Sequence, residues 1–170
     1  MSIMNDKAYI AKCEKYHLNP GFIYVSMVPT IISTVLGSCV AVCMFDRVKK
    51  FGGMNHYLFP KISNAEKPTA RYGDVSIKKL YSTFIEFGSD PSSLTAHIIG
   101  GAYLENNKES KVISDENIRI CFHYLGELGI KIISEDTGGI MGRKLIYFSE
   151  QNEIFVAKLQ KIRSTDYYSK

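Results

Sequence analysis

Two residues in this sequence have the types and the spacing for thiol chemistry. Cys39 stands after Gly37 and Ser38 and before a continuous apolar run, and His56 follows soon after. A Gly-Ser pair allows a sharp turn that exposes backbone N–H groups, and an apolar run anchors such a turn. A thiol held in this way, with an imidazole in reach, is the minimum equipment for nucleophilic catalysis by a thiolate. The N–H groups around Gly37 and Ser38 are candidate donors to an oxyanion.

The other cysteines give no competing site. Cys43 and Cys121 lie within apolar patterns and are predicted to be core residues, and Cys13 lies in the N-terminal region. The four cysteines form no CxxC pair and match no common structural zinc spacing, so we expect thiols in a reducing compartment and no metal. The remaining histidines lack comparable surroundings (His17, His97 and His123).

Composition places the chain among globular proteins. It has 170 residues, of which 45% are hydrophobic and 22% charged, enough apolar content to bury a core. The net charge of +4 is scattered, which argues against nucleic acid as a partner. No apolar run approaches the roughly 20 residues of a membrane span, and the polar N-terminus does not have the pattern of a signal peptide. We therefore expect a cytoplasmic protein without membrane insertion.

Two predicted helices interrupt a series of strands. The strands are expected at 22–25, 31–36, 40–45, 51–59, 97–99, 131–135, 144–148 and 154–159. One helix should run over 74–87, and a second should begin at the cap Ser114 and end before Gly129. Strands 40–45 and 51–59 should form a hairpin that brings His56 back towards Cys39.

The order of these elements does not alternate regularly, which argues against a doubly wound parallel sheet. It favours an α+β fold in which mixed β-sheets form a sandwich-like core with two or three helices packed outside. The expected organisation is an N-terminal extension at 1–20, a single domain at 21–160 and a C-terminal tail at 161–170. Glycine pairs at 100–101 and 138–139 do not continue as nucleotide-binding motifs, and no cofactor is expected.

Five segments of the sequence form a recognisable set when taken in order. They are Leu-Gly-Ser-Cys-Val-Ala-Val at 36–42, Gly-Gly-Met-Asn-His at 52–56, Arg-Tyr-Gly-Asp at 71–74, Gly-Gly-Ala at 100–102 and Asp-Thr-Gly-Gly-Ile-Met-Gly-Arg-Lys at 136–144. With these segments the chain resembles the CheD family of chemoreceptor glutamine deamidases, and the resemblance runs from about residue 21 to residue 159.

The resemblance implies hydrolysis of glutamine side chains on the cytoplasmic helices of chemoreceptors. The family's nucleophile falls on Cys39 and its histidine on His56, and the implied reaction passes through a thioester and releases ammonia. Hydrolysis of glutamyl methyl esters is the same acyl chemistry. Gly53 and Asn55, beside the histidine, are candidate substrate contacts.

Two positions depart from the family's pattern. The family's threonine, six residues before the cysteine, falls on Ser33, which keeps the hydroxyl but loses the methyl group. Alternation along a strand would place Ser33 on the same side as Cys39 and Thr34 on the other, so Ser33 is predicted to orient the imidazole. In the segment 113–117, where the family usually has Ile-Gly-x-Arg-Asn, this chain has Ser114 and Glu116.

Two other functions stay open at this stage. The chain could act as a non-catalytic or weakly catalytic binding module that docks on chemoreceptors or on the CheC-type phosphatase with which the family is associated. It could also be a general thiol hydrolase for a small amide, in which case free glutamine would be turned over.

Overall fold

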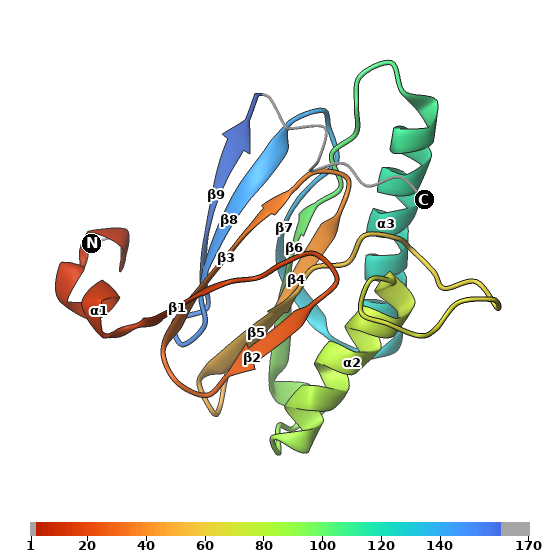
Figure 1. The fold of residues 1–170 in the computed structure, drawn as a ribbon. Coiled ribbons are helices and arrows are strands. Elements are labelled where there is room, and N and C mark those ends of the chain that lie inside the picture. The colour runs from red at the N-terminus through yellow and green to blue at the C-terminus, as the bar shows by residue number, and fades with distance from the viewer. Residues whose placement is uncertain (1–2, 161–170) are drawn as a thin grey trace.

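Two β-sheets face each other, and two helices cover the outer face of one of them (Figure 1). The structure is a computed structural model, and it describes residues 3–160. The helices are η1 (Ile3–Asn5), α1 (Lys7–Lys12), α2 (Gly73–Glu86), η2 (Pro91–Ser93) and α3 (Lys108–Glu127). The strands are β1 (Glu14–His17), β2 (Ile23–Ser26), β3 (Thr30–Leu36), β4 (Val40–Asp46), β5 (Phe51–Asn55), β6 (Leu94–Gly100), β7 (Lys131–Thr137), β8 (Gly142–Phe148) and β9 (Glu153–Leu159).

The sheets are both mixed. Sheet A has the order β1-β3-β8-β9 and sheet B the order β2-β5-β4-β6-β7. The pairs β1–β3 and β6–β7 are parallel, and the other pairs are antiparallel. The expected α+β sandwich is therefore confirmed, and so is the hairpin of β4 and β5.

Strand β4 is buried along its whole length because it is covered on both faces. Cys39, Ala41 and Cys43 belong to the apolar layer between the two sheets. Val40 and Val42 belong to the second core, under α2 and α3. A near-continuous apolar strand is what such two-sided burial requires.

Helix α3 begins earlier than expected. The side chain of Asn107 caps it by accepting a hydrogen bond from the N–H of Ser110 at 2.9 Å, so the helix starts at Lys108 rather than after Ser114. Ser114 is not the cap. It is buried inside the helix, and its hydroxyl donates to the carbonyl of Gly101.

The N-terminal region also differs from the expected extension at 1–20. Strand β1 pairs with β3, with His17 opposite Ser33, and Leu18 is fully buried. All four residues of β1 are exposed, so the strand has none of the apolar alternation by which a strand is recognised in a sequence. The predicted tail at 161–170 lies outside the described residues. Within residues 3–160, no helix is long and apolar enough to cross a membrane.

Candidate active site

Cys39 ends the turn by which the chain crosses from sheet A to sheet B. Strand β3 ends at Leu36 and β4 begins at Val40, so the Gly-Ser turn joins opposed sheets. Each carbonyl of the turn accepts a hydrogen bond: Gly37 from the N–H of Ala102 at 2.8 Å, Ser38 from Nδ2 of Asn117 at 2.9 Å, and Cys39 from the N–H of Gly101 at 2.7 Å. These bonds fix the orientation of the three peptide groups around the thiol.

Gly100 allows the chain to come this close to Cys39. Its φ of 122° is a conformation that residues with a Cβ rarely adopt, and a Cβ built on it would lie 2.3 Å from the carbonyl oxygen of Cys39. The Gly-Gly pair at 100–101 thus serves backbone packing around the turn.

His56 lies on the same face of sheet B as Cys39. The bridge between Val40 and Tyr57 continues the register of β4 and β5, which places Cys39 opposite Leu58. His56 is then the diagonal neighbour of Cys39, at a Cα separation of about 7–8 Å across which longer side chains interact. Both residues are 1% exposed. The structure therefore brings the predicted thiol and imidazole to one buried layer.

Thr34 reaches His56 from the opposite sheet. Its hydroxyl oxygen lies 2.8 Å from Nδ1 of His56 and 2.8 Å from the carbonyl oxygen of Leu18. A carbonyl can only accept, so the single hydroxyl proton is donated to Leu18. The same oxygen must then accept from Nδ1–H of His56. This tautomer leaves Nε2 as an unprotonated nitrogen.

Burial keeps His56 neutral. It lowers the pKa of the imidazole to about 3, and the electrostatic influence of His17 acts in the same direction. Nε2 is buried and has no hydrogen-bond partner among the described residues. The neutral imidazole presents a lone pair within the buried layer, and an unprotonated nitrogen is what a general base requires.

Ser33 does not take the place predicted for it. Side chains along β3 alternate between buried and half-buried, with Thr34 on the buried face and Ser33 on the outer face of sheet A. The hydroxyl of Ser33 lies 3.4 Å from Nδ1 of His17. The prediction that Ser33 orients His56 is therefore wrong, and Thr34 holds that position.

The two candidate substrate contacts lie in β5, the strand that precedes His56. The side-chain oxygen of Asn55 accepts from the N–H of Val42 in the neighbouring strand β4 at 2.7 Å. Gly53 lies opposite Met44 within the strand, and a Cβ there would lie 2.6 Å from the side chain of Val25. Gly53 allows close strand packing, while Nδ2 of Asn55 is buried without a hydrogen-bond partner among the described residues, so a substrate contact by either residue stays a prediction.

Asn117 is a site residue that the sequence reasoning missed. Its Nδ2 donates to the carbonyls of Ser38 and Leu58, both at 2.9 Å. It thereby ties α3 to the Cys39 turn and to the chain that follows His56. In the sequence, Asn117 matches the asparagine that ends the family's Ile-Gly-x-Arg-Asn pattern at 113–117, and this match is the signal that could have identified it.

A second missed group is the ion-pair network of the motif at 136–144. Arg143, 2% exposed, pairs with Asp136 at 2.8 Å, and Lys158 contacts the same carboxylate. Burial raises the pKa of Asp136, but hydrogen bonds from Lys158 and Arg143 outweigh this and hold it below its usual value. Arg143 lies opposite Leu36, so the network supports the strand end that leads into the Cys39 turn.

A cavity borders the segment that carries His56. The carbonyl of His56 accepts from the N–H of Gly21 at 2.7 Å, and the N–H of His56 donates to the carbonyl of Phe22 at 3.1 Å. Both of these residues line a cavity of about 530 Å³, together with Pro20, Leu58, Thr69 and Arg71. Leu58 is the cross-strand neighbour of Cys39, so this cavity lies next to the layer that holds the thiol.

A buried thiol and a tautomer-fixed imidazole between the sheets of an α+β sandwich define a candidate thiol hydrolase. The family model described as CheD chemotactic sensory transduction matches residues 58–158. Three similar curated relatives are each named probable chemoreceptor glutamine deamidase CheD. The one from Sulfurimonas denitrificans is 35% identical over 150 residues, covering 87% of this chain and 96% of the relative. The one from Anaeromyxobacter dehalogenans (CheD 1) is 38% identical, covering 84% of each chain, and the one from Methanococcus maripaludis is 34% identical, covering 85% of this chain and 95% of the relative.

This chain belongs to the CheD family, and the resemblance found in the sequence is confirmed.

Proposed function

We propose that this protein converts glutamine side chains of chemoreceptors to glutamate, with Cys39 as the nucleophile and His56 as the base. The names of its relatives support the substrate class. The observation that carries the proposal is the hydrogen-bond chain from Leu18 through Thr34 to His56, which leaves Nε2 unprotonated on the face of sheet B that bears Cys39.

The first half of the reaction forms a thioester. Sγ of Cys39 attacks Cδ of the glutamine while its proton passes to Nε2 of His56. The tetrahedral intermediate collapses when His56 returns that proton to the amide nitrogen, which leaves as ammonia. Because burial disfavours an imidazolium, the proton transfer and the attack are expected to occur together rather than through a stable ion pair.

The second half hydrolyses the thioester. His56 takes a proton from water as the oxygen attacks the thioester carbon, and the proton then passes to the departing sulfur of Cys39. The sum is glutamine plus water giving glutamate plus ammonia. A glutamyl methyl ester would react by the same steps, with methanol in place of ammonia.

Backbone N–H groups of the turn are the proposed donors to the oxyanion. In a trans peptide the C=O and the following N–H point in opposite directions. The carbonyls of Gly37 and Ser38 point to Ala102 and Asn117, so the N–H groups of Ser38 and Cys39 point the other way. Donors fixed before the reaction cost no reorganisation when the oxyanion forms.

The cavity that contains Gly21 and Phe22 is the proposed approach for the substrate. It lies beside the chain that carries His56, and its lining is largely apolar with Arg71 as its charged residue. A glutamine presented from a receptor helix in the cytoplasm would enter past Leu58 to reach the thiol.

The test is mass spectrometry of a chemoreceptor cytoplasmic fragment after incubation with three proteins: the native chain, Cys39→Ala and the matched control Cys43→Ala. We expect conversion of glutamine to glutamate, a gain of about 1 Da per site, with the native chain and the control only. Conversion by Cys39→Ala would contradict the assigned nucleophile. Each reaction is run with and without a CheC-type phosphatase, which tests the proposed partner.

The outcome also separates the alternatives. If no protein converts the receptor but Cys39→Ala still restores the signalling phenotype of a deletion strain, the chain acts as a binding module on receptors or on the phosphatase. Turnover of free glutamine would indicate a general amidase.

A further inference from the structure

We propose that the main-chain carbonyl of Leu18 is a positioning group of the active site, because it takes the Thr34 hydroxyl proton and thereby selects the tautomer of His56. This inference rests on the proposed function for its effect on turnover, but its structural part can be tested without it.

The selection follows from counting protons. The Thr34 hydroxyl has one proton and lies 2.8 Å from both of its partners. If that proton points to Leu18, Nδ1 of His56 must be the donor and Nε2 the acceptor. If the proton pointed to Nδ1 instead, Nε2 would carry the ring hydrogen and could not accept a proton from the thiol. Leu18 is therefore what distinguishes a base from an inert imidazole.

Leu18 is held firmly enough to do this. Its N–H donates to the carbonyl of Ser33 at 2.8 Å, which continues the parallel pairing of β1 with β3. Its side chain is fully buried in the layer between the sheets. One residue thus bonds β3 through its N–H and the next side chain of β3, Thr34, through its C=O.

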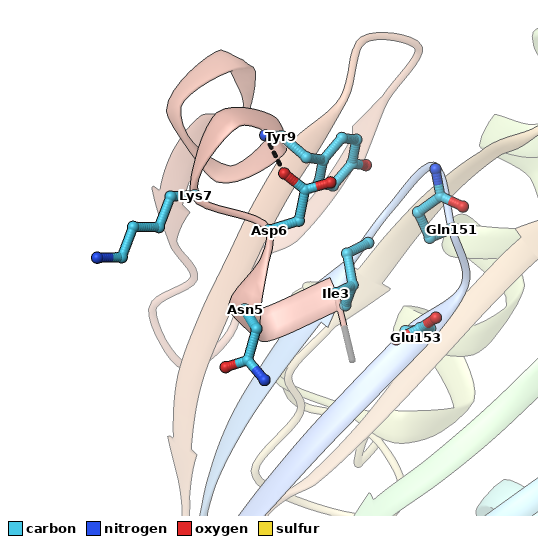
Figure 2. A pocket seen from close by; sticks show the side chains of 7 residues that line it. All are labelled: Ile3, Asn5, Asp6, Lys7, Tyr9, Gln151 and Glu153. Atoms are coloured by element: carbon cyan, nitrogen blue, oxygen red, sulfur yellow. Dashed lines mark hydrogen bonds between the residues drawn. The ribbon is translucent and has the colours of Figure 1, made fainter. Parts of the chain in front are cut away.

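The segment that precedes Leu18 is docked on the rest of the fold. Tyr9 donates to the carboxylate of Glu150 at 3.2 Å and stacks on Phe148 with ring centroids 6.3 Å apart. Asp6 caps α1 by accepting from the N–H of Tyr9, and Figure 2 shows both side chains beside the turn between β8 and β9. Further along, the N–H of Glu14 donates to the carbonyl of Pro29 at 2.9 Å.

These contacts anchor β1 at its start and so fix the Leu18 carbonyl at its end. A small cavity of about 530 Å³ lies between α1 and the β8–β9 turn, lined by residues that include Ile3, Tyr9 and Glu153 (Figure 2). The N-terminal segment is therefore a structural part of the site rather than an appendage to it.

The experiment replaces single backbone atoms by semisynthesis. Native chemical ligation at Cys39 joins a synthetic 1–38 thioester to the fragment 39–170 and leaves no added residue. The test protein carries an ester between Leu18 and Asn19, which makes the Leu18 carbonyl a weaker acceptor. The matched control carries an ester between His17 and Leu18, which removes the N–H that bonds Ser33 but keeps the Leu18 carbonyl as an amide. A ligated all-amide chain is the reference.

We expect the 18–19 ester to lower kcat about fivefold, the loss of part of one hydrogen bond, while KM stays within about twofold. The 17–18 ester should lower stability, and it should lower kcat clearly less than the 18–19 ester does, because the Leu18 carbonyl stays an amide acceptor. Imidazole ¹⁵N shifts of His56 should show the Nδ1–H tautomer in the reference and the control, and a mixture with Nε2–H in the test protein.

Equal kcat for all three ligated proteins, or an unchanged tautomer in the 18–19 ester, would overturn the inference. Equal losses from both esters would also overturn it, because they would indicate only a weakened strand. If the reference itself does not deamidate receptors, the proposed function fails while the ¹⁵N readout still decides the role of Leu18. A thioamide at Leu18, which keeps the Asn19 N–H, serves if the ester does not fold.

Discussion

The acid side of the stability curve should depend on His56. Its pKa lies at about 3 in the folded protein because of burial, against 6.5 for the unperturbed group. As the pH falls, the unfolded chain therefore takes up this proton before the folded protein does. The stabilisation by neutral His56 is fully present above pH 6.5 and is lost as the pH falls from there towards 3.

The magnitude follows from the two pKa values. Each pH unit between them costs about 1.4 kcal/mol, so His56 alone should lower the free energy of unfolding by about 2.5 kcal/mol between about pH 7.5 and about pH 4.5. Urea denaturation at these two pH values measures this for the native chain and for His56→Gln. We expect the loss at low pH to be smaller in the variant by about that amount.

His123→Gln is the control, since His123 is exposed and lies 3.6 Å from Glu127 on the surface of α3. It should leave the pH dependence close to that of the native chain. Parallel pH profiles for the native chain and His56→Gln would refute the assignment of a buried, neutral imidazole. A ¹⁵N titration in which His56 becomes protonated near pH 6 would refute it independently.

Three further results are expected. Iodoacetamide should alkylate Cys39 about tenfold faster than Cys121, because burial raises the pKa of Cys121 to about 12. Equal rates for the two thiols in the folded protein would contradict an activated thiol at Cys39. Thr34→Val should lower kcat about tenfold or more while Ser33→Ala leaves it near the native value, and the reverse order would show that the outer face of β3 carries the orienting group. Gly100→Ala should lower the free energy of unfolding in urea by about 2 kcal/mol or more, because the positive φ of Gly100 and the nearby Cys39 carbonyl leave no room for a Cβ. A variant as stable as the native chain would show that the turn adapts to the added Cβ.

Much of the fold could be predicted because its elements carry strong local signals. Strand β4 is apolar throughout, and helix α2 has a periodic apolar stripe that ends at Gly88. Strand β1 could not be predicted, since Glu14–His17 is wholly exposed and its pairing with β3 is set by contacts distant in sequence. The early start of α3 at Lys108 depended on Asn107 as a cap inside a stretch that otherwise resembles a loop.

The error at Ser33 has a more general cause. Alternation fixes the face of each residue only within one strand. The prediction counted back from Cys39 to Ser33 as though the strand were continuous, but the Gly-Ser turn lies between them. Because that turn takes the chain from sheet A to sheet B, the alternation of side chains in β4 does not determine which residues of β3 face the same layer.

The face of each side chain in β3 can be assigned when the alternation is counted within β3 alone. Ile32 and Leu36 pack into the layer between the sheets, so Thr34 must do so too and Ser33 must face outwards. The turn that places the thiol at the boundary between the sheets is therefore also the reason why counting residues back from Cys39 selects the wrong hydroxyl. The partner could have been found by asking which hydroxyl shares a face with the apolar residues of its own strand, rather than with the nucleophile.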